Sequence, residues 1–206
     1  MDKIHKLIII FVLLFSAVIL AYIYMSVSSG NKYLFKNNHY GFQIETPSNW
    51  IAEKDSFYTE ENINEILNDC ANDREGLALY KVGSFRFLDQ KKLSNLEDFN
   101  QTPSDITSGA FLKIEINCIP ESATKKLIDY SFSNIKIGGE KAFQTFFNSL
   151  TFGSVNHFSF NYGGFQYKIE QYVYISSEEK LNEEKIRNSY SKIFNNIMAS
   201  FNLINS

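Results

Sequence analysis

The feature that most constrains the fold is a pair of alternating segments joined by two glycines, "VNHFSFNYGGFQYKIEQYVYI", residues 155–175. Apolar and polar residues largely alternate on both sides of Gly163-Gly164. A period of two indicates β-strands, and a glycine pair allows the positive φ angles of a two-residue hairpin turn. This stretch therefore predicts an antiparallel hairpin, and "IKIGGEKAFQTFF", residues 135–147, predicts a second one.

Three further strands are predicted, at residues 40–45, 76–89 and 110–118, with Gly83 as a bulge or turn in the second. A short helix is expected after Pro120, and residues 89–109 are expected to form a polar loop with a helical turn. Strands in sequence with hairpin turns favour an antiparallel sheet with helices packed on it.

Two amphipathic helices are predicted, one in each half of the chain. In residues 59–70 Thr59 caps alone, because Asn62 stands where a capping box needs Glu or Gln. The last helix follows Ser176 and Glu179, which match the capping box S-x-x-E. Apolar residues recur at helical spacing in both, as Ile63, Ile66, Leu67 and Cys70 and as Ile186, Tyr190, Ile193, Ile197 and Phe201.

The N-terminus carries an uncharged apolar run, residues 7–24. As a helix it would be about 27 Å long, which approaches the hydrocarbon core of a bilayer. Lysines in residues 1–6 favour a cytoplasmic N-terminus, so we expect a single-pass membrane protein with its domain on the extracytoplasmic side. A cleaved signal peptide and a buried core helix are the alternatives. Residues 25–38 are expected to be a polar linker and residues 39–206 one domain.

The hydrophobic content and the net charge of the chain indicate which classes of partner this domain can bind. The chain of 206 residues has 44% hydrophobic residues, 16% aromatic residues and a formal net charge of −3. These values are typical of a globular domain and give no basic face for nucleic acid. We therefore expect the membrane and a protein as partners, and no nucleic acid.

The stretch "YGFQIETPSNW", with Tyr40, Phe42, Pro47 and Trp50, resembles the N-terminal signature of the PsbP-like (Mog/PsbP-like) family. "IKIGGEKAF" looks like the mid-domain strand of that family, and "QYKIEQYVYI" with the helix ending in "IMASF" is similar to its C-terminal hairpin and helix. The resemblance covers roughly residues 40–202 and implies an α+β fold, a central antiparallel sheet between helices in an α/β/α sandwich. Family members include lumenal photosystem II subunits and a Ran-binding protein, so the fold alone does not define a function.

Few residues suggest chemistry. His39 and His157 have no partner at metal-ligand spacing, and no nucleophile or metalloprotease motif occurs. We assign no catalytic, cofactor or metal residues. Cys70 and Cys118 fall on apolar faces, and we expect two buried thiols, with a disulfide as the alternative. An acidic cluster lies at the start of the last helix, where negative charges interact favourably with the helix dipole. A weak divalent-ion site is the alternative interpretation. The cluster comprises Glu178, Glu179, Glu183 and Glu184.

The sequence thus favours a non-catalytic, membrane-anchored module that binds a protein or assists an envelope complex. The alternatives are a hydrolase or other enzyme with a site assembled from scattered polar residues, and a structural envelope protein that self-associates. The candidate partner surface is the second face of the strand 165–175, with Tyr172, Tyr174 and Lys168. If a helix covers this face, the tyrosines belong to the core instead.

Overall fold

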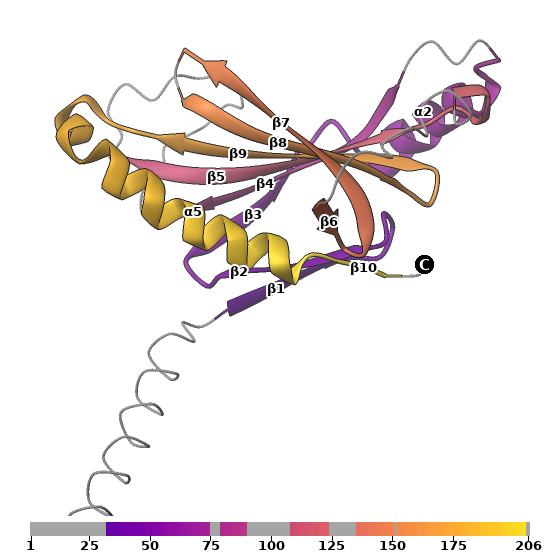
Figure 1. The fold of residues 1–206 in the computed structure, drawn as a ribbon. Coiled ribbons are helices and arrows are strands. Elements are labelled where there is room, and N and C mark those ends of the chain that lie inside the picture. Colours follow the sequence, from indigo (N-terminus) through magenta and orange to yellow (C-terminus); the bar gives the residue numbers. More distant parts are fainter. Residues whose placement is uncertain (1–31, 75–78, 90–107, 124–134, 151, 205–206) are drawn as a thin grey trace, which may run out of the picture.

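The computed structural model describes residues 32–74, 79–89, 108–123, 135–150 and 152–204. They form an α+β fold in which a twisted antiparallel sheet of seven strands is crossed by a long helix, α5 (Figure 1). The strand order is β3-β4-β5-β9-β8-β7-β6. The strands are β3 (Trp50–Lys54), β4 (Tyr80–Asp89), β5 (Gly109–Cys118), β6 (Ile135–Ile137), β7 (Glu140–Ser149), β8 (Gly153–Tyr162) and β9 (Phe165–Tyr174). The predicted antiparallel sheet is confirmed.

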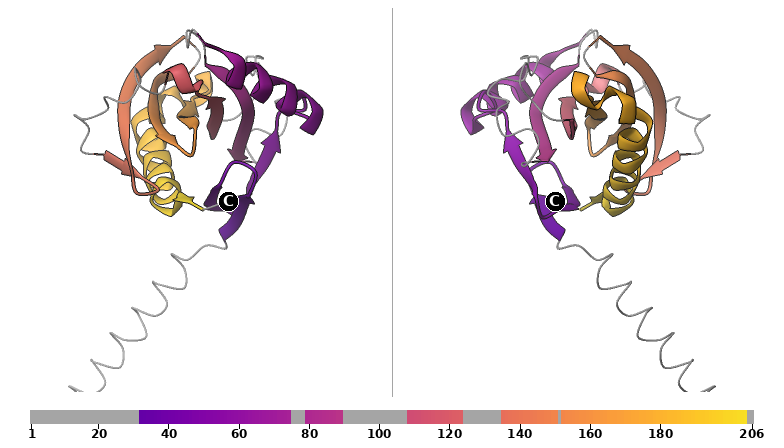
Figure 2. Two further views of the ribbon diagram at one scale, coloured as in Figure 1. Left: turned by 90° about the vertical axis from the view of Figure 1, so that its right-hand side faces the viewer. Right: turned by 90° about the vertical axis from the view of Figure 1, so that its left-hand side faces the viewer.

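A second sheet joins the two ends of the described chain. Its strands are β1 (Lys32–Asn37), β2 (Phe42–Pro47) and β10 (Asn202–Leu203), in the order β1-β2-β10. The C-terminal strand therefore lies beside the first hairpin (Figure 2). The expectation that residues 25–38 form only a linker is wrong for residues 32–37, because β1 pairs with β2 along its whole length.

One face of the seven-stranded sheet packs against α5 (Glu183–Ser200) and β2 to form the core. Phe42 stacks on Phe201 with ring centroids 5.6 Å apart and meets Tyr167 edge to face. The Tyr167 hydroxyl donates to the Tyr40 carbonyl, and the Tyr40 hydroxyl donates to the Val82 carbonyl. Buried tyrosines need such partners, and here they join β2 to the sheet.

The residues singled out at the N-terminal signature occupy the expected places. Tyr40, Phe42 and Trp50 are buried, with Trp50 3% exposed and its ring 5.9 Å from that of Phe194. Pro47 is the last residue of β2, and a turn at residues 48–49 leads into β3. A proline cannot donate to a sheet ladder, which explains why the strand ends there.

Helix α2 (Glu60–Asn72) packs against β4. Thr59 caps it alone through a hydrogen bond from the Asn62 backbone N–H, as expected. The expectation of two free thiols is wrong, because Cys70 and Cys118 form a disulfide between α2 and β5, with Cα atoms 6.3 Å apart. Both cysteines lie on apolar faces that meet, so proximity in the fold allows the bond.

The last helix starts later than predicted. A 3-10 helix, η1 (Ser177–Asn182), comes first, and the Ser176 side chain makes no capping hydrogen bond to it. The Glu179 carboxylate instead accepts a hydrogen bond from the Ser108 backbone N–H, at 2.8 Å. The predicted capping box is therefore wrong. The Glu179 carboxylate binds the backbone of Ser108, which is distant in sequence.

Both predicted glycine-pair hairpins are confirmed, as β6–β7 and β8–β9. The register of β4 against β5 shifts between Lys81 and Gly83, which confirms the expected bulge. After Pro120 the structure describes a helix only at residues 121–123, and most of the predicted polar loop lies outside the described residues. The three-layer arrangement with helices on both faces of the sheet stays a prediction.

Candidate binding face

The face of the sheet opposite α5 carries charged side chains in rows across the strands. Strand registers place Glu53, Arg86, Lys113, Glu170 and His157 opposite one another, on β3, β4, β5, β9 and β8 in turn. In an antiparallel sheet, residues directly opposite share a face with their Cβ atoms about 5 Å apart. Residues far apart in sequence therefore meet in one row.

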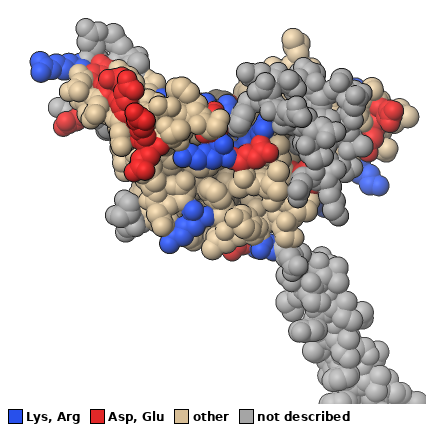
Figure 3. Space-filling view, turned by 180° about the vertical axis from the view of Figure 1, so that it is seen from behind, with Lys and Arg blue, Asp and Glu red and all other residues tan. Residues whose placement is uncertain are grey.

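The next row has Ser84, Glu115, Lys168 and Ser159 on β4, β5, β9 and β8. Together with Lys81, the charged residues of the two rows form what we call the charged face: Glu53, Lys81, Arg86, Lys113, Glu115, His157, Lys168 and Glu170. Viewed from behind, basic and acidic side chains lie side by side near the middle of the molecule (Figure 3).

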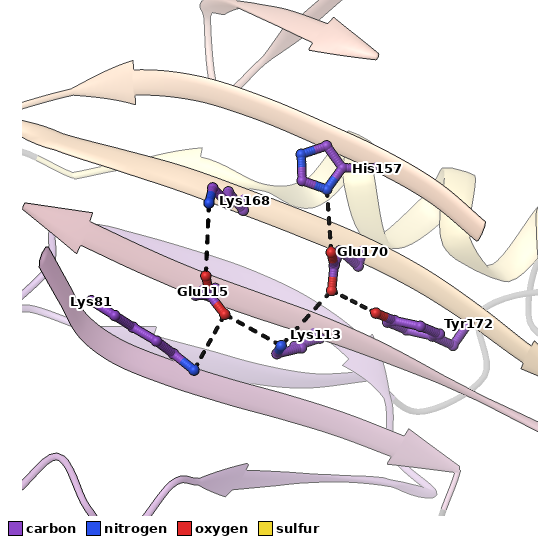
Figure 4. A network of polar contacts seen from close by, with 7 residues as sticks. All are labelled: Lys81, Lys113, Glu115, His157, Lys168, Glu170 and Tyr172. Carbon is purple, nitrogen blue, oxygen red and sulfur yellow. Dashed lines mark hydrogen bonds and ion pairs between the residues drawn. The ribbon is translucent and has the colours of Figure 1, made fainter. Parts of the chain in front are cut away.

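Glu115 lies at the centre of three lysines. Its carboxylate is 3.2 Å from Lys81 Nζ, 3.3 Å from Lys113 Nζ and 3.9 Å from Lys168 Nζ (Figure 4). Burial by itself raises the pKa of Glu115, but the charges and hydrogen bonds of Lys113 and Lys81 outweigh it, so the net shift is downward. Glu115 is therefore ionised at neutral pH.

Glu170 is held in a similar way by different groups. It accepts a hydrogen bond from the Tyr172 hydroxyl at 2.6 Å, lies 3.3 Å from His157 Nδ1 and is 3.9 Å from Lys113 Nζ (Figure 4). Burial raises the pKa of Glu170, whereas hydrogen bonds from His157 and Tyr172 and the charge of Lys113 lower it, and the lowering prevails. Burial, followed by its bond to Glu170, raises the pKa of Tyr172, so this hydroxyl stays a donor.

Aromatic rings border one end of the charged face. Tyr172 stacks on Phe111 with centroids 4.4 Å apart, and Phe152 meets Tyr172 edge to face. Tyr174 lies 6.4 Å from Phe152. At the other end, a lysine faces an aromatic ring, since Lys81 Nζ lies 5.5 Å from the centre of the Tyr58 ring.

Three polar atoms on the same face are buried without a hydrogen-bond partner among the described residues. They are Ser84 Oγ, Asn117 Nδ2 and Asn161 Oδ1. Their strand registers place them in the two polar rows or in the row beside them. Buried polar atoms usually have a hydrogen-bond partner, so these three atoms are exceptions within the described residues.

The structure brings the predicted partner-surface residues together on β9. Lys168 belongs to the charged face, Tyr172 joins it to the aromatic end, and Tyr174 lies beyond. All three side chains are partly exposed. Whether they bind a partner stays a prediction.

Sequence reasoning missed the pairing of His157 with Glu170. The sequence did contain a signal for this pair, because the glycine-pair turn fixes the hairpin register. His157 lies six positions before Gly163 and Glu170 six positions after Gly164, so the two residues face one another. Metal-ligand spacing concerns residues close in sequence, whereas Glu170 lies opposite His157 across the hairpin.

Two of the four glutamates in the acidic cluster at the last helix, Glu179 and Glu183, make contacts within the chain. Glu183 binds Arg187 at 2.8 Å and Lys180 at 3.6 Å, and Glu179 binds the Ser108 backbone. Within the described ranges, no group of three or more His, Cys, Asp or Glu side chains is placed to hold a metal ion. No helix of the described part is long and apolar enough to cross a membrane, and residues 7–24 lie outside that part.

The chain matches no family model, and comparisons with curated proteins and with solved structures also give no match.

Proposed function

We propose that this chain is a membrane-anchored, extracytoplasmic module of PsbP-like type, which binds a protein partner as a non-catalytic accessory of a membrane or envelope complex. The observation that carries the proposal is the charged face, a set of cross-strand ion pairs on a sheet surface that α5 does not cover. Tyr172 and Phe111 add a stacked aromatic pair at its edge.

The charges on this face suit short-range recognition. Four cations, Lys81, Arg86, Lys113 and Lys168, stand against three carboxylates, Glu53, Glu115 and Glu170. Such a nearly balanced set produces little long-range attraction, but it fixes where a donor or acceptor of a partner fits. The side chains of Lys81, Lys113, Glu115, Lys168 and Glu170 are 19–34% exposed, so they remain within reach of a partner.

The disulfide supports an extracytoplasmic location. Disulfides persist in oxidising compartments and are rare in the cytosol, where thiol reductants keep cysteines reduced. Cys70–Cys118 joins α2 to β5 beside the sheet. The apolar run at residues 7–24 with lysines before it is the second support.

We expect binding to depend on the aromatic and basic part of the charged face. The test uses the full-length chain in its native membranes, with Tyr172→Ser combined with Tyr174→Ser in one variant and Lys168→Glu in another. Lys32→Glu is the control, because Lys32 lies on β1 and its side chain is 60% exposed. Chemical cross-linking followed by mass spectrometry should recover a partner with wild type and Lys32→Glu, and lose it with the other two variants.

Thermal unfolding separates this result from simple loss of structure. A large drop in Tm for the double tyrosine variant would assign these residues to the core. A variant that keeps both its Tm and its partner would show that the charged face is not the binding surface.

A separate experiment tests location. Protease added to intact cells should remove the domain, and alkylation of the denatured chain should find Cys70 and Cys118 unreactive until a reductant is added. Digestion only after lysis, with two reactive thiols, would contradict the extracytoplasmic assignment.

A further inference from the structure

Among the described strands, none covers the central part of the outer edge of β7. β6 pairs only with Glu140–Ala142 at the start of β7, while β8 pairs with its other edge from Phe143 to Ser149. No described strand pairs with the outer edge from Gln144 to Asn148. Open strand edges present unpaired backbone donors and acceptors, so they readily take another strand.

The side chains on this edge are also unusual for one that faces water. Phe146 is 65% exposed and Phe147 41% exposed, and Leu150, just beyond the strand, is fully exposed. The segment "FQTFFNS", residues 143–149, contains no charge, proline or glycine. Segments of this kind have high strand propensity and pair with other strands when exposed.

The strand at the opposite edge of the same sheet, β3, differs from β7 in length and in charge. β3 has five residues, and Glu53 and Lys54 among them are charged. Short, charged edge strands are the usual means by which a protein prevents edge-to-edge pairing. β7 has ten residues and lacks this protection over its open part.

The backbone phase of β7 identifies which residues point outward. Ile137 and Glu140 flank the two-residue turn at Gly138-Gly139, so they form a hydrogen-bonded pair. Every second residue from Glu140 then directs its backbone N–H and C=O toward the outer edge. On the open part these residues are Gln144, Phe146 and Asn148.

We propose that the open edge of β7 pairs antiparallel with the same edge of a second copy, about a two-fold axis at Phe146. In this register Phe146 faces Phe146 of the other copy, Gln144 faces Asn148, and Thr145 faces Phe147. Phe146 is the middle of the open stretch, so this register uses all of it and stops short of Ala142, where β6 begins.

The sequence of the β7 edge favours pairing with a second copy of this chain. A strand that pairs here must bring no charge against five uncharged residues, and "QTFFN" meets this condition when paired with itself. The register places a phenyl ring opposite a phenyl ring, a favourable cross-strand pair, and an amide opposite an amide, as in Asn/Gln ladders. The same patch serves both copies, as in any two-fold interface.

This pairing has a consequence for the charged face. A two-fold axis through an antiparallel strand pair stands perpendicular to the sheet, so both copies turn the same face to the same side. The charged faces of the two copies would then lie on the same side of one extended sheet. The inference does not depend on the proposed partner, because the edge and the face consist of different residues.

Cross-linking of the full-length chain in its native membranes tests the register. Residues in a hydrogen-bonded antiparallel pair have Cα atoms about 5.5 Å apart, so Phe146→Cys should be joined to its own copy by a short bis-maleimide. Leu181→Cys is the matched control, because Leu181 is fully exposed and lies on η1. A dimer band for Phe146→Cys and none for Leu181→Cys is the expected result, and equal bands would overturn the proposal.

A second experiment measures dimer formation without a cross-linker. For the full chain in detergent, sedimentation should show a wild-type dimer. Phe146→Lys should raise its dissociation constant by about tenfold or more, because like charges would face one another where two rings were buried. Circular dichroism should show an unchanged fold, since the position is solvent-exposed. A monomeric wild type at all concentrations, or a dimer indifferent to Phe146→Lys, would overturn the proposal, as would an edge that binds only a different protein.

Discussion

The two faces of the seven-stranded sheet come from the same strands but differ in nearly every respect. On the core face, Phe87, Leu112, Ile114 and Ile169 are fully buried under α5 and β2. On the charged face, Lys113 and Glu115 alternate with Leu112 and Ile114 along β5 and remain partly exposed. Along β5, alternation of apolar and charged residues therefore places the core on one face of the sheet and partly exposed charges on the other.

The largest effect is expected on the core face. Trp50→Ala should lower the free energy of unfolding by about 3–5 kcal/mol, because it removes a buried ring that packs against Phe194 and leaves a cavity. Denaturant unfolding of the full chain measures the change.

The matched control is Phe57→Ala. Phe57 is 61% exposed, so its removal should change the stability by about 0.5 kcal/mol or less. A loss below about 1 kcal/mol for Trp50→Ala would show that the core face does not depend on its edge strand, and the contrast between the faces would then be weaker than burial suggests.

Much of the fold could be predicted from local patterns, because alternation and turn residues act over a few positions. The glycine pairs located two hairpins, and Gly163-Gly164 also fixed the register that brings Phe160 onto Tyr167. The charged rows required one step more. Lys113 faces Glu170 only once β5 is known to neighbour β9, and no local pattern states that strand order.

The remaining differences have a common physical origin in contacts between distant residues. β1 lacks alternation in "KYLFKN" and is a strand because β2 pairs with it. Cys70 and Cys118 are 48 positions apart, and only the packing of α2 makes them neighbours. Glu179 could not be recognised as a partner of Ser108 from a capping motif, since the competing hydrogen bond comes from another part of the chain.

A smaller effect is expected on the charged face, and it should depend on pH. Glu115 and Glu170 both have a lowered pKa in the folded chain. A carboxyl group with a lowered folded pKa is protonated first in the unfolded state. Its contribution to stability is therefore fully present above the unfolded pKa of about 4.3 and disappears as the pH falls through the folded value.

Glu170→Gln should isolate this contribution. The groups that face Glu170 are Lys113, His157 and Tyr172, and all three interact with its charge. At neutral pH the variant should lose about 1 kcal/mol, a value reduced from that of a buried charged hydrogen bond because the site is partly exposed to solvent. Below the folded pKa of Glu170 the variant and wild type should become equally stable, since both then carry a neutral side chain.

Glu45→Gln provides the control for carboxylates in general, because the Glu45 side chain is 41% exposed and pairs with exposed Lys32. Its stability should differ from wild type by less than about 0.5 kcal/mol at every pH. Denaturant midpoints measured for the three proteins between acidic and neutral pH give the comparison. If Glu170→Gln differed from wild type by the same amount at all pH values, the charge of Glu170 would contribute nothing, and the charged face would act through packing as the core face does.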